Sequence, residues 1–401
     1  MPLRRSLLGG TSALVLSAAL LGGANPGAAG DDAAPELPAS TSLVTDGGQQ
    51  VRLQVLPQVV QQGPRVADPD TARAALTATV EPVRVGRRIR LQVQVGTAWT
   101  SVAIERQDAR GRVEFAAPAA RRGQPLTYRV KAAKIGGLAA VESGTVSTSR
   151  WTTPTWTDEF SGTALSPDWS FRGLDYEEDS LRRCSKAGVE AVRVARGAVR
   201  LSVVKDPART TKCKARKDGK VVGKYAYRLN GHIGTQGGFD FTYGVAAARI
   251  KFHRSRGQHG AFWMQPVSGN YPGSPGHEID IIEYFGDHHP RGGLTSFIHR
   301  YEDGVEVRRG ARVANFGSFL AGRRDGWSKN FHVFSVEWTP RLLVFRIDGR
   351  ETGRIRGGIS SVAQYPILSL LASDYEIPHM RDRQLPQHMY VDWIRVWETG
   401  S

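Results

Sequence analysis

Three acidic residues lie close together in residues 276–286, which read GHEIDIIEYFG. Glu278, Asp280 and Glu283 are interleaved with three isoleucines. β-Branched residues that alternate with polar ones favour a strand over a helix. We therefore expect a strand that presents carboxylates on one face.

Side-chain parity decides whether the three acids can act together. Successive side chains of a strand point to opposite faces, so Glu278 and Asp280 share a face and Glu283 points to the other. A β-bulge at Ile281–Ile282 adds one residue and returns Glu283 to the acidic face. Like charges on one face repel and raise a pKa, which suits chemistry that needs one protonated and one ionised carboxyl near neutral pH.

Glycoside hydrolysis needs such a pair, with the carboxyl groups about 5 to 5.5 Å apart in a retaining enzyme. A strand rises about 3.3 Å per residue, so it would have to curve for the carboxyl groups of Glu278 and Glu283 to converge. An acidic strand face that forms salt bridges with neighbouring arginines has the same spacing. Spacing alone leaves both interpretations open.

The elements that must position this strand are themselves strand-like. The 401 residues include 45 Gly and 21 Pro, with 40% hydrophobic and 23% charged residues, as in a folded, turn-rich, mostly β chain. Alternating runs recur through residues 151–401 without a constant period, which predicts one large antiparallel sandwich rather than a propeller. These runs include Ala198–Val204, Val245–Phe252, Phe331–Trp338, Leu342–Ile347 and Met389–Val396.

The N-terminus has the pattern of a targeting signal. Arg4 and Arg5 precede an uncharged stretch at residues 7–24, and small residues follow at 26–29. We predict a signal peptide over residues 1–29 and a secreted, extracellular protein with no membrane anchor after cleavage. The paired arginines also loosely resemble a twin-arginine signal, so the export route stays open.

A smaller domain is expected before the acidic strand. Residues 30–48 are rich in Ala, Pro, Ser, Thr and Asp and predict a flexible linker. Alternating runs such as Val51–Val55 and Ile89–Val95 then predict an immunoglobulin- or fibronectin-like β-sandwich over residues 49–150. It shows no cluster of titratable or aromatic residues, which favours a spacer over a carbohydrate- or wall-binding module. The second domain would span residues 151–401.

The charge of the chain is strongly positive. The net charge is +16, and Arg outnumbers Lys 43 to 11. Most basic residues are scattered among the strand-like runs, which argues against a nucleic-acid site, where charge gathers on one face. A Lys-rich stretch at residues 205–224 reads as a solvated loop, or as a contact with an anionic polysaccharide or the cell wall.

The two cysteines, Cys184 and Cys213, are expected to form a disulfide, because an exported chain meets an oxidising environment. Two lone thiols are a poor metal site, and neither cysteine has a suitable His and Asp pair nearby for nucleophilic work. Closing a loop of about thirty residues is worth about 3 to 4 kcal/mol in the chain-entropy description.

The acidic strand resembles the E-x-D-x-x-E signature of glycoside hydrolase family 16, in its bulged, laminarinase-like form. The resemblance covers residues 154–398, because further matches follow in chain order. They are Trp156–Phe160, Ala248–Lys251, Ala261–Met264, Phe331–Pro340, Ile347–Gly349 and Val391–Val396.

This resemblance implies a concave jelly-roll sandwich with an open cleft, and retaining endo cleavage of a β-linked polysaccharide. By motif position, Glu278 would be the nucleophile and Glu283 the general acid that later acts as the base. Asp280 would hydrogen-bond the nucleophile and help to set its charge. Burial beside the isoleucines would raise the pKa of Glu283, as an acid catalyst requires.

Sugars need flat aromatic rings and polar neighbours. Trp263, shortly before the acidic strand, is the first candidate for a stacking platform, and His299 on the following strand is expected near the acid/base. Asn230 and Gln387 are weaker candidates for substrate binding. Either could instead bond backbone groups at a turn.

The resemblance leaves the substrate open. Laminarinase-like members often carry a Trp-Pro pair before the segment matched by Ala261–Met264, and this chain has Gly257–Gly260 there. The first expectation is hydrolysis of β-1,3-glucan, with β-galactan or agar-type polysaccharides as the alternative. A non-catalytic glucan-binding module is a further alternative, although the presence of all three acids argues against it. Transglycosylation shares the same intermediate and stays open.

No cofactor is expected to be required. His277, His288 and His289 crowd the motif but lack the H-E-x-x-H spacing of a zinc site. The resemblance also suggests a structural calcium on the convex face, for which Glu159 and Asp392 are the candidates. A polysaccharide is the expected partner of a monomeric protein, with no nucleic acid and no membrane.

Overall fold

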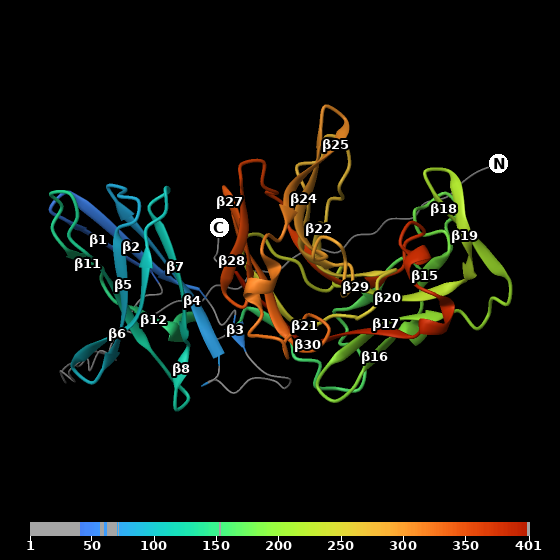
Figure 1. Ribbon diagram of the computed structural model, residues 1–401, viewed down its shortest axis with the longest axis horizontal. Coiled ribbons are helices and arrows are strands. Elements are labelled where there is room, and N and C mark those ends of the chain that lie inside the picture. The colour runs from blue at the N-terminus through green and yellow to red at the C-terminus, as the bar shows by residue number, and fades with distance from the viewer. Residues whose placement is uncertain (1–40, 57–59, 62–69, 71, 152–153, 399–401) are drawn as a thin grey trace, which may run out of the picture. The chain divides into compact units, whose positions relative to one another are not determined.

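The computed structural model describes residues 41–56, 60–61, 70, 72–151 and 154–398 (Figure 1). The predicted signal peptide lies outside the described residues, as does the first part of the predicted linker. The described residues form strands and short 3-10 turns, which confirms the all-β prediction. Among them, no helix has the length and apolar character needed to cross a membrane.

The N-terminal strands form two five-stranded sheets. Apolar side chains from both sheets share one core, which includes Leu53, Leu76, Leu91 and Val130. The first sheet contains β1 (Thr41–Asp46), β2 (Gln49–Val55), β3 (Val60–Gln61), β4 (Ala72–Glu81) and β7 (Arg112–Pro118). The second contains β5 (Arg88–Val95), β6 (Ala98–Arg106), β10 (Thr127–Ala132), β11 (Val141–Glu142) and β12 (Val146–Ser147), and a separate short pair joins β8 (Ala120–Arg121) to β9 (Gln124–Pro125).

The prediction of a linker up to residue 48 is wrong at its end. Thr41–Asp46 forms β1 and pairs antiparallel with β2. The two strands are joined at Gly47 and Gly48, which both have positive φ, at 53° and 74°. Two successive left-handed residues match the twist of a tight hairpin, and glycine adopts this conformation at low cost.

A curved sheet of sixteen strands makes up the second part of the chain. Its main path runs β25-β24-β23-β22-β29-β20-β17-β30-β21-β26-β27-β28, and β25 and β28 at its two ends contact each other. The path strands are β17 (Val199–Lys205), β20 (Arg228–Gly234), β21 (Gly244–Lys251), β22 (His259–Pro266), β23 (Glu278–Tyr284), β24 (Leu294–Glu302), β25 (Val305–Arg312), β26 (His332–Thr339), β27 (Leu342–Ile347), β28 (Arg350–Arg356), β29 (Gln364–Leu371) and β30 (Gln387–Glu398).

Shorter elements complete this part of the chain. The strands β13 (Trp156–Asp158), β14 (Ser170–Phe171), β15 (Ser185–Ala187) and β16 (Val192–Val194) pair with strands of the main path, and β18 (Lys212–Lys217) and β19 (Lys220–Ala226) form a separate hairpin. The 3-10 turns are η2 (Thr148–Trp151), η3 (Val189–Ala191), η4 (Phe316–Phe319), η5 (Ile377–His379) and η6 (Asp382–Gln384).

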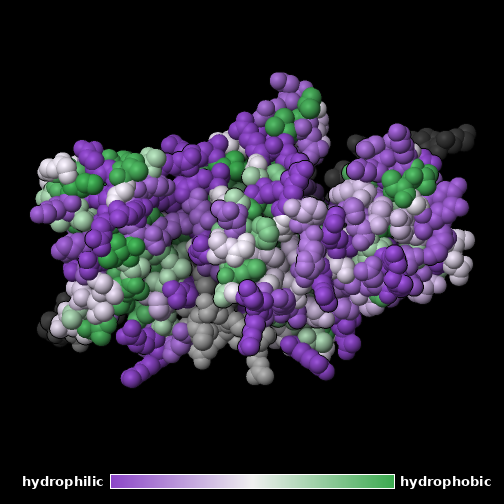
Figure 2. All heavy atoms as spheres, in the orientation of Figure 1, coloured by the Kyte–Doolittle hydropathy of each residue, from purple (hydrophilic) through white to green (hydrophobic). Residues whose placement is uncertain are grey.

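The curled sheet encloses one large core. Side chains from its two halves meet there, such as Phe262 and Ile279 from one half and Phe334 and Ile394 from the other. The sheet therefore closes on itself as the expected jelly-roll sandwich. The β24–β25 hairpin projects at the top of Figure 1, and Figure 2 shows mostly hydrophilic residues on its visible face.

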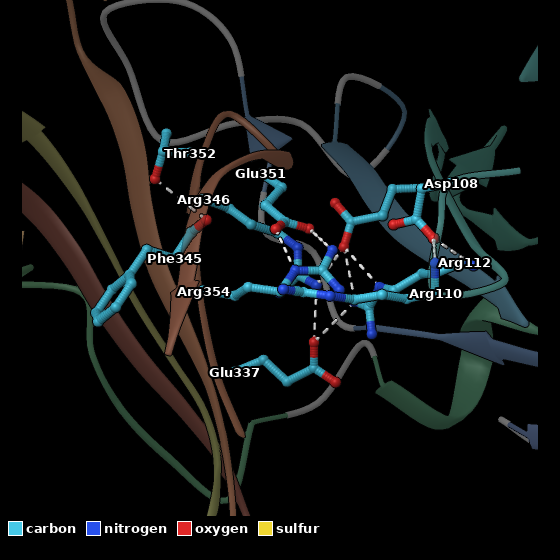
Figure 3. A network of polar contacts seen from close by, with 10 residues as sticks. Asp108, Arg110, Arg112, Glu337, Phe345, Arg346, Glu351, Thr352 and Arg354 are labelled. Atoms are coloured by element: carbon cyan, nitrogen blue, oxygen red, sulfur yellow. Dashed lines mark hydrogen bonds and ion pairs between the residues drawn. The ribbon is translucent and has the colours of Figure 1, made fainter. Parts of the chain in front are cut away.

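A buried ion network links β7 to β26 and β27 (Figure 3). Arg346 is fully buried and lies 2.7 Å from Glu337 and 2.8 Å from Glu114. Arg112 lies 2.6 Å from Glu114 and 3.3 Å from Glu337. Two arginines and two glutamates thus compensate one another's charge where water is scarce, which a buried charge requires.

The disulfide between Cys184 and Cys213 is present, as predicted, with a Cα–Cα distance of 5.6 Å. It ties the start of β15 to β18. The Lys-rich stretch expected to be a loop is the β18–β19 hairpin. The bridge therefore fastens a hairpin, rather than a loose loop, to the main sheet.

Candidate active site

The acidic strand β23 contains the bulge that side-chain parity requires. Its pairing with β22 passes from Phe262 opposite Ile282 to Trp263 opposite Asp280, so Ile281 is the extra residue. The hydroxyl of Ser296 donates a hydrogen bond to the Ile281 carbonyl over 2.8 Å. A polar side chain thus satisfies a backbone group that the disrupted ladder leaves unpaired.

The bulge places the three acids on one side of the sheet and the isoleucines on the other. Glu278, Asp280 and Glu283 line one hollow of about 1000 Å³. Ile279 and Ile282 are buried in the core of the sandwich. The acids and the core residues of one strand therefore lie on opposite faces, as the sequence pattern predicts.

Glu283 has an environment that favours the protonated carboxyl. Burial, followed by the nearby charge of Asp280, raises the pKa of Glu283 to about 7. Thr295 lies opposite Glu283 on β24, and its hydroxyl donates to Glu283 Oε2 over 2.9 Å. This bond favours the ionised form and opposes the increase in pKa.

Glu278 is held by a side-chain amide. Gln265 Nε2 donates to Glu278 Oε2 over 2.8 Å, which leaves the second carboxylate oxygen available to a substrate. Burial raises the pKa of Glu278, and the bond from Gln265 opposes that effect. The amide therefore favours the ionised form of Glu278, against the effect of burial.

His299 lies between two carboxylates, those of Asp280 and Glu306, and pairs with both. His299 Nε2 lies 3.0 Å from Asp280, and His299 Nδ1 lies 2.6 Å from Glu306. Burial disfavours charge on His299, but the bonds to both carboxylates outweigh it and raise the pKa of His299 to about 9. Burial and the charge of Glu278 raise the pKa of Asp280 to about 6, against the effect of His299. A cationic His299 therefore compensates Asp280.

A second buried pair lies beside the acids. His259 Nδ1 is 2.9 Å from Glu376, and both residues line the same hollow. Burial disfavours the charged imidazole, but Glu376 outweighs this and raises the pKa of His259. His259 also interacts with Glu283, whose ionised form it favours. No motif in the sequence predicts this pair.

Trp263 stands next to the acids without lining the main hollow. It lies opposite Asp280 and is partly exposed. Its indole N–H donates to Ser369 over 3.1 Å, and its ring stacks on His232 with centroids 6.0 Å apart. This fixed ring remains the candidate for sugar stacking.

Asn230 and Gln387, the weaker candidates for substrate binding, both bond groups of the protein itself. Asn230 is buried, donates to Ser185 Oγ over 2.9 Å and accepts from the backbone of Ala372. Gln387 accepts from the backbone N–H of Ser255 and donates to a backbone carbonyl. Both amides are occupied by groups of the protein itself, which is the alternative that their sequence context left open.

The expected calcium ligands do not fit a calcium site. Both oxygens of Glu159 accept hydrogen bonds from the guanidinium of Arg395, at 2.7 and 2.9 Å. Asp392 pairs with the buried Arg249 over 2.5 Å. Calcium needs six to eight oxygen ligands. A guanidinium already supplies the positive charge at each of these two carboxylates.

One of the site residues that the motif does not predict could be inferred from strand periodicity. Gln265 follows Trp263 by two positions on β22, so strand periodicity places both on one face. Thr295 could be found only from the register of β23 and β24. His259 and Glu376 are separated by 117 positions, and no local pattern joins them.

The comparison of this chain with known families gives one match that covers half of it. The family model described as Glycosyl hydrolases family 16 matches residues 193–395. The chain belongs to glycosyl hydrolase family 16. The matched region includes the acidic strand and most of the curled sheet, so the resemblance in the sequence is confirmed.

Curated relatives match over part of their length. A keratan-sulfate endo-1,4-beta-galactosidase from Sphingobacterium multivorum is 26% identical over 195 residues, which cover 46% of this chain and 43% of the relative. A beta-glucanase from Rhodothermus marinus is 24% identical over 200 residues, which cover 48% of this chain and 62% of the relative. The chain thus spans about half the length of the curated relatives it matches.

A solved structure matches at a similar level. The laminarinase catalytic domain from Thermotoga maritima MSB8 has 22% identity and a TM-score of 0.48. The match covers 62% of this chain and 99% of that domain.

Proposed function

We propose that this family 16 protein is a secreted retaining endo-β-glycosidase that hydrolyses a β-linked polysaccharide by double displacement. The observation that carries the proposal is the pair Glu278 and Glu283 in one hollow. Burial raises the pKa of both acids, that of Glu283 to about 7, and the hydrogen bond from Gln265 opposes the increase at Glu278. Two carboxyls with different protonation states are what this chemistry requires.

In the first step, Glu283 donates its proton to the glycosidic oxygen as that oxygen leaves C1. The free carboxylate oxygen of Glu278 attacks C1 and forms a covalent glycosyl-enzyme. In the second step, the now ionised Glu283 takes a proton from water, and the resulting hydroxide attacks C1 and releases Glu278. Two inversions at C1 give overall retention of configuration.

Asp280 and His299 act around this pair. Asp280 lies between Glu278 and Glu283 in the strand, and its charge raises the pKa of Glu283. His299 compensates Asp280 from the neighbouring strand and thereby limits repulsion among three acids. Trp263 is the proposed stacking surface for a sugar ring.

β-1,3-Glucan is the first substrate to test, because the motif resembles the laminarinase form and one curated relative is called a beta-glucanase. A β-galactan is the second, supported by the absence of the Trp-Pro pair and by the relative called a galactosidase. Release of reducing ends from laminarin, lichenan, agarose, carrageenan and β-galactan separates these possibilities.

The decisive experiment compares Glu278→Gln, Glu283→Gln and the exposed-site control Glu105→Gln on the polymer that is cleaved. The two cleft variants should lose at least about a thousandfold in turnover, because each removes a group that makes or breaks a bond. The control should keep full activity. A non-catalytic binding module predicts instead that no polymer is cleaved, while Glu278→Gln binds as the unchanged protein does.

Azide separates the roles of the two glutamates. With an activated aryl glycoside, whose phenolate leaves without protonation, the glycosyl-enzyme can still form in Glu283→Ala, and azide needs no general base, so rescue should yield a glycosyl azide of retained configuration. In Glu278→Ala azide would replace the nucleophile and yield the inverted product. The opposite assignment of products would refute the proposed roles.

A further inference from the structure

Six cationic side chains surround the acids. They line the same hollow of about 1000 Å³ and come from separate parts of the chain: the loop before β15, the β18–β19 hairpin, two loops next to β22 and β23, and β25. We call this set the cationic rim, and its members are Arg182, Lys217, Arg256, Arg291, Arg308 and Arg312.

The rim is not explained by ion pairing. Among the described residues, no salt bridge includes a rim side chain. A smaller hollow of about 380 Å³ between β25 and β28 is also rich in arginine and shares Arg312 with the rim. There Arg309 pairs with Glu302 and Arg354 with Glu351. Arginine is abundant in this chain, and in the rim its charge is left uncompensated.

Three rim charges act on one histidine that lines the same hollow. Burial, followed by the charges of Arg256 and Arg312, lowers the pKa of His289, and Arg291 acts in the same direction. Like charges gathered in one hollow repel, and an anion placed among them removes that repulsion.

The backbone beside the acids is shaped to hold Arg256 in place. Gly286 follows β23 with a φ of 96°, and a Cβ there would lie 2.7 Å from the backbone nitrogen of Arg256. The N–H of Asp287 also donates to the Arg254 carbonyl over 2.8 Å. The loop that carries Arg256 therefore passes directly against the end of the catalytic strand. On β25, the Arg308 guanidinium lies 4.5 Å from the centre of the Phe297 ring, which orients it.

The positive charge of the rim does not extend to the hollow next to it. A neighbouring hollow of about 310 Å³ shares Glu278 with the main one, but its lining has no Lys or Arg. Its polar groups are neutral amides and phenols, including Gln265, Asn270 and Tyr365, together with Glu306. Neutral amides and hydroxyls suit unsubstituted sugars, whereas arginine binds sulfate or carboxylate through paired N–H groups.

We infer that the cleft takes an anionic polysaccharide, whose sulfate or carboxylate groups contact the cationic rim while unsubstituted sugars occupy the neighbouring hollow beside Glu278, which is lined by no Lys or Arg. This inference rests on the proposed glycosidase function for the cleavage step, but the binding that it describes can be measured without cleavage.

The test uses the full chain with Glu278→Gln, so that bound polymer is not cleaved. Laminarin, laminarin sulfate and C6-oxidised laminarin share one backbone and separate neutral, sulfate and carboxylate ligands. Agarose and κ-carrageenan provide a second comparison, between a neutral and a sulfated galactan. Dissociation constants are measured at 50 and 300 mM NaCl, because contacts between exposed charges weaken as salt screens them.

We expect the sulfated or the carboxylated polymer to bind at least about tenfold more tightly than its neutral counterpart at low salt. Arg256→Gln and Arg312→Gln should each weaken anionic binding about tenfold, as expected for loss of one hydrogen bond to a charged group, and leave neutral binding unchanged. The control Arg193→Gln, on the exposed face of β16, removes the same charge outside the cleft. It should bind like the parent.

Equal affinity for neutral and anionic polymers overturns the inference, as does an equal loss in Arg193→Gln and Arg256→Gln. Turnover by the chain without Glu278→Gln keeps the two proposals apart. Cleavage of a neutral polymer that is unaffected by the rim variants, with no preference for anions, would refute the inference and leave the glycosidase proposal standing. Selective binding of anionic polymer without any cleavage would support the inference and refute the glycosidase proposal.

Discussion

Thr295 lowers the pKa of the proposed acid catalyst through a single hydrogen bond. Its hydroxyl donates to Glu283 Oε2 over 2.9 Å and stabilises the ionised carboxylate. Burial and Asp280 raise the pKa of Glu283 to about 7 in spite of this bond. Thr295→Val keeps the β-branched shape and removes the donor, so the pKa of Glu283 should rise further.

The size of the shift follows from the strength of the bond. A hydrogen bond to a charged group contributes about 1.5 to 3 kcal/mol net and one between neutral groups about 0.5 to 1.5 kcal/mol, so the bond favours the ionised carboxylate by about 1 to 1.5 kcal/mol. One pKa unit corresponds to about 1.36 kcal/mol, so the expected increase is about 0.7 to 1.1 units. Thr295 is buried, and solvent therefore does not readily replace the lost donor.

The pH dependence of kcat/KM measures this shift, because it reports the pKa values of the free enzyme. The basic limb, where Glu283 loses its proton, should move from about pH 7 to higher pH in Thr295→Val. Thr295→Ser keeps the hydroxyl and should restore the original limb. A basic limb that stays in place or moves to lower pH in Thr295→Val would refute the reasoning. The same limb position in Thr295→Ser and Thr295→Val would refute it as well.

The remaining predictions concern stability and are measured by urea unfolding. Glu337→Gln should lower the free energy of unfolding by about 3 kcal/mol, the lower end for a broken buried pair, because Arg346 keeps a second glutamate. Paired replacement of Cys184 and Cys213 by Ser should cost about 3 to 4 kcal/mol, and added reductant should then have no further effect. His332→Gln should destabilise more at pH 5.5 than at pH 9. Two aspartates raise the pKa of His332 against the effect of burial, so its stabilising contribution is present below its ordinary pKa and is lost as pH rises through the higher folded value.

The acidic strand could be predicted from the sequence because local rules were sufficient. Alternation distinguishes strand from helix, and five positions between Glu278 and Glu283 require an extra residue if both are to share a face. The structure places that residue at Ile281. The β-strand runs and the disulfide followed from equally local or compositional signals.

Polar residues away from the motif were harder to interpret. The sequence does not say whether an amide such as Asn230 faces a cleft or bonds the protein's own groups, because both environments accept the same side chain. The rim residues Arg256 and Arg291 lie in loops, whose course depends on contacts such as that of Gly286 with the 254–256 loop. The charge of the chain was visible, but its concentration around the acids required the folded structure.

The rim and the acids have separate electrostatic roles, and this separation has a measurable consequence. The charges that act most strongly on Glu283 are those of Asp280, His259 and His299, and no rim arginine is among them. Sulfate groups held at the rim should therefore leave the ionisation of Glu283 unchanged. The basic limb of kcat, which reports the enzyme–substrate complex, should lie at the same pH with laminarin sulfate as with laminarin, and at the same pH in Arg256→Gln as in the parent. A limb for kcat that moves to higher pH with laminarin sulfate and returns at 300 mM NaCl would contradict the argument.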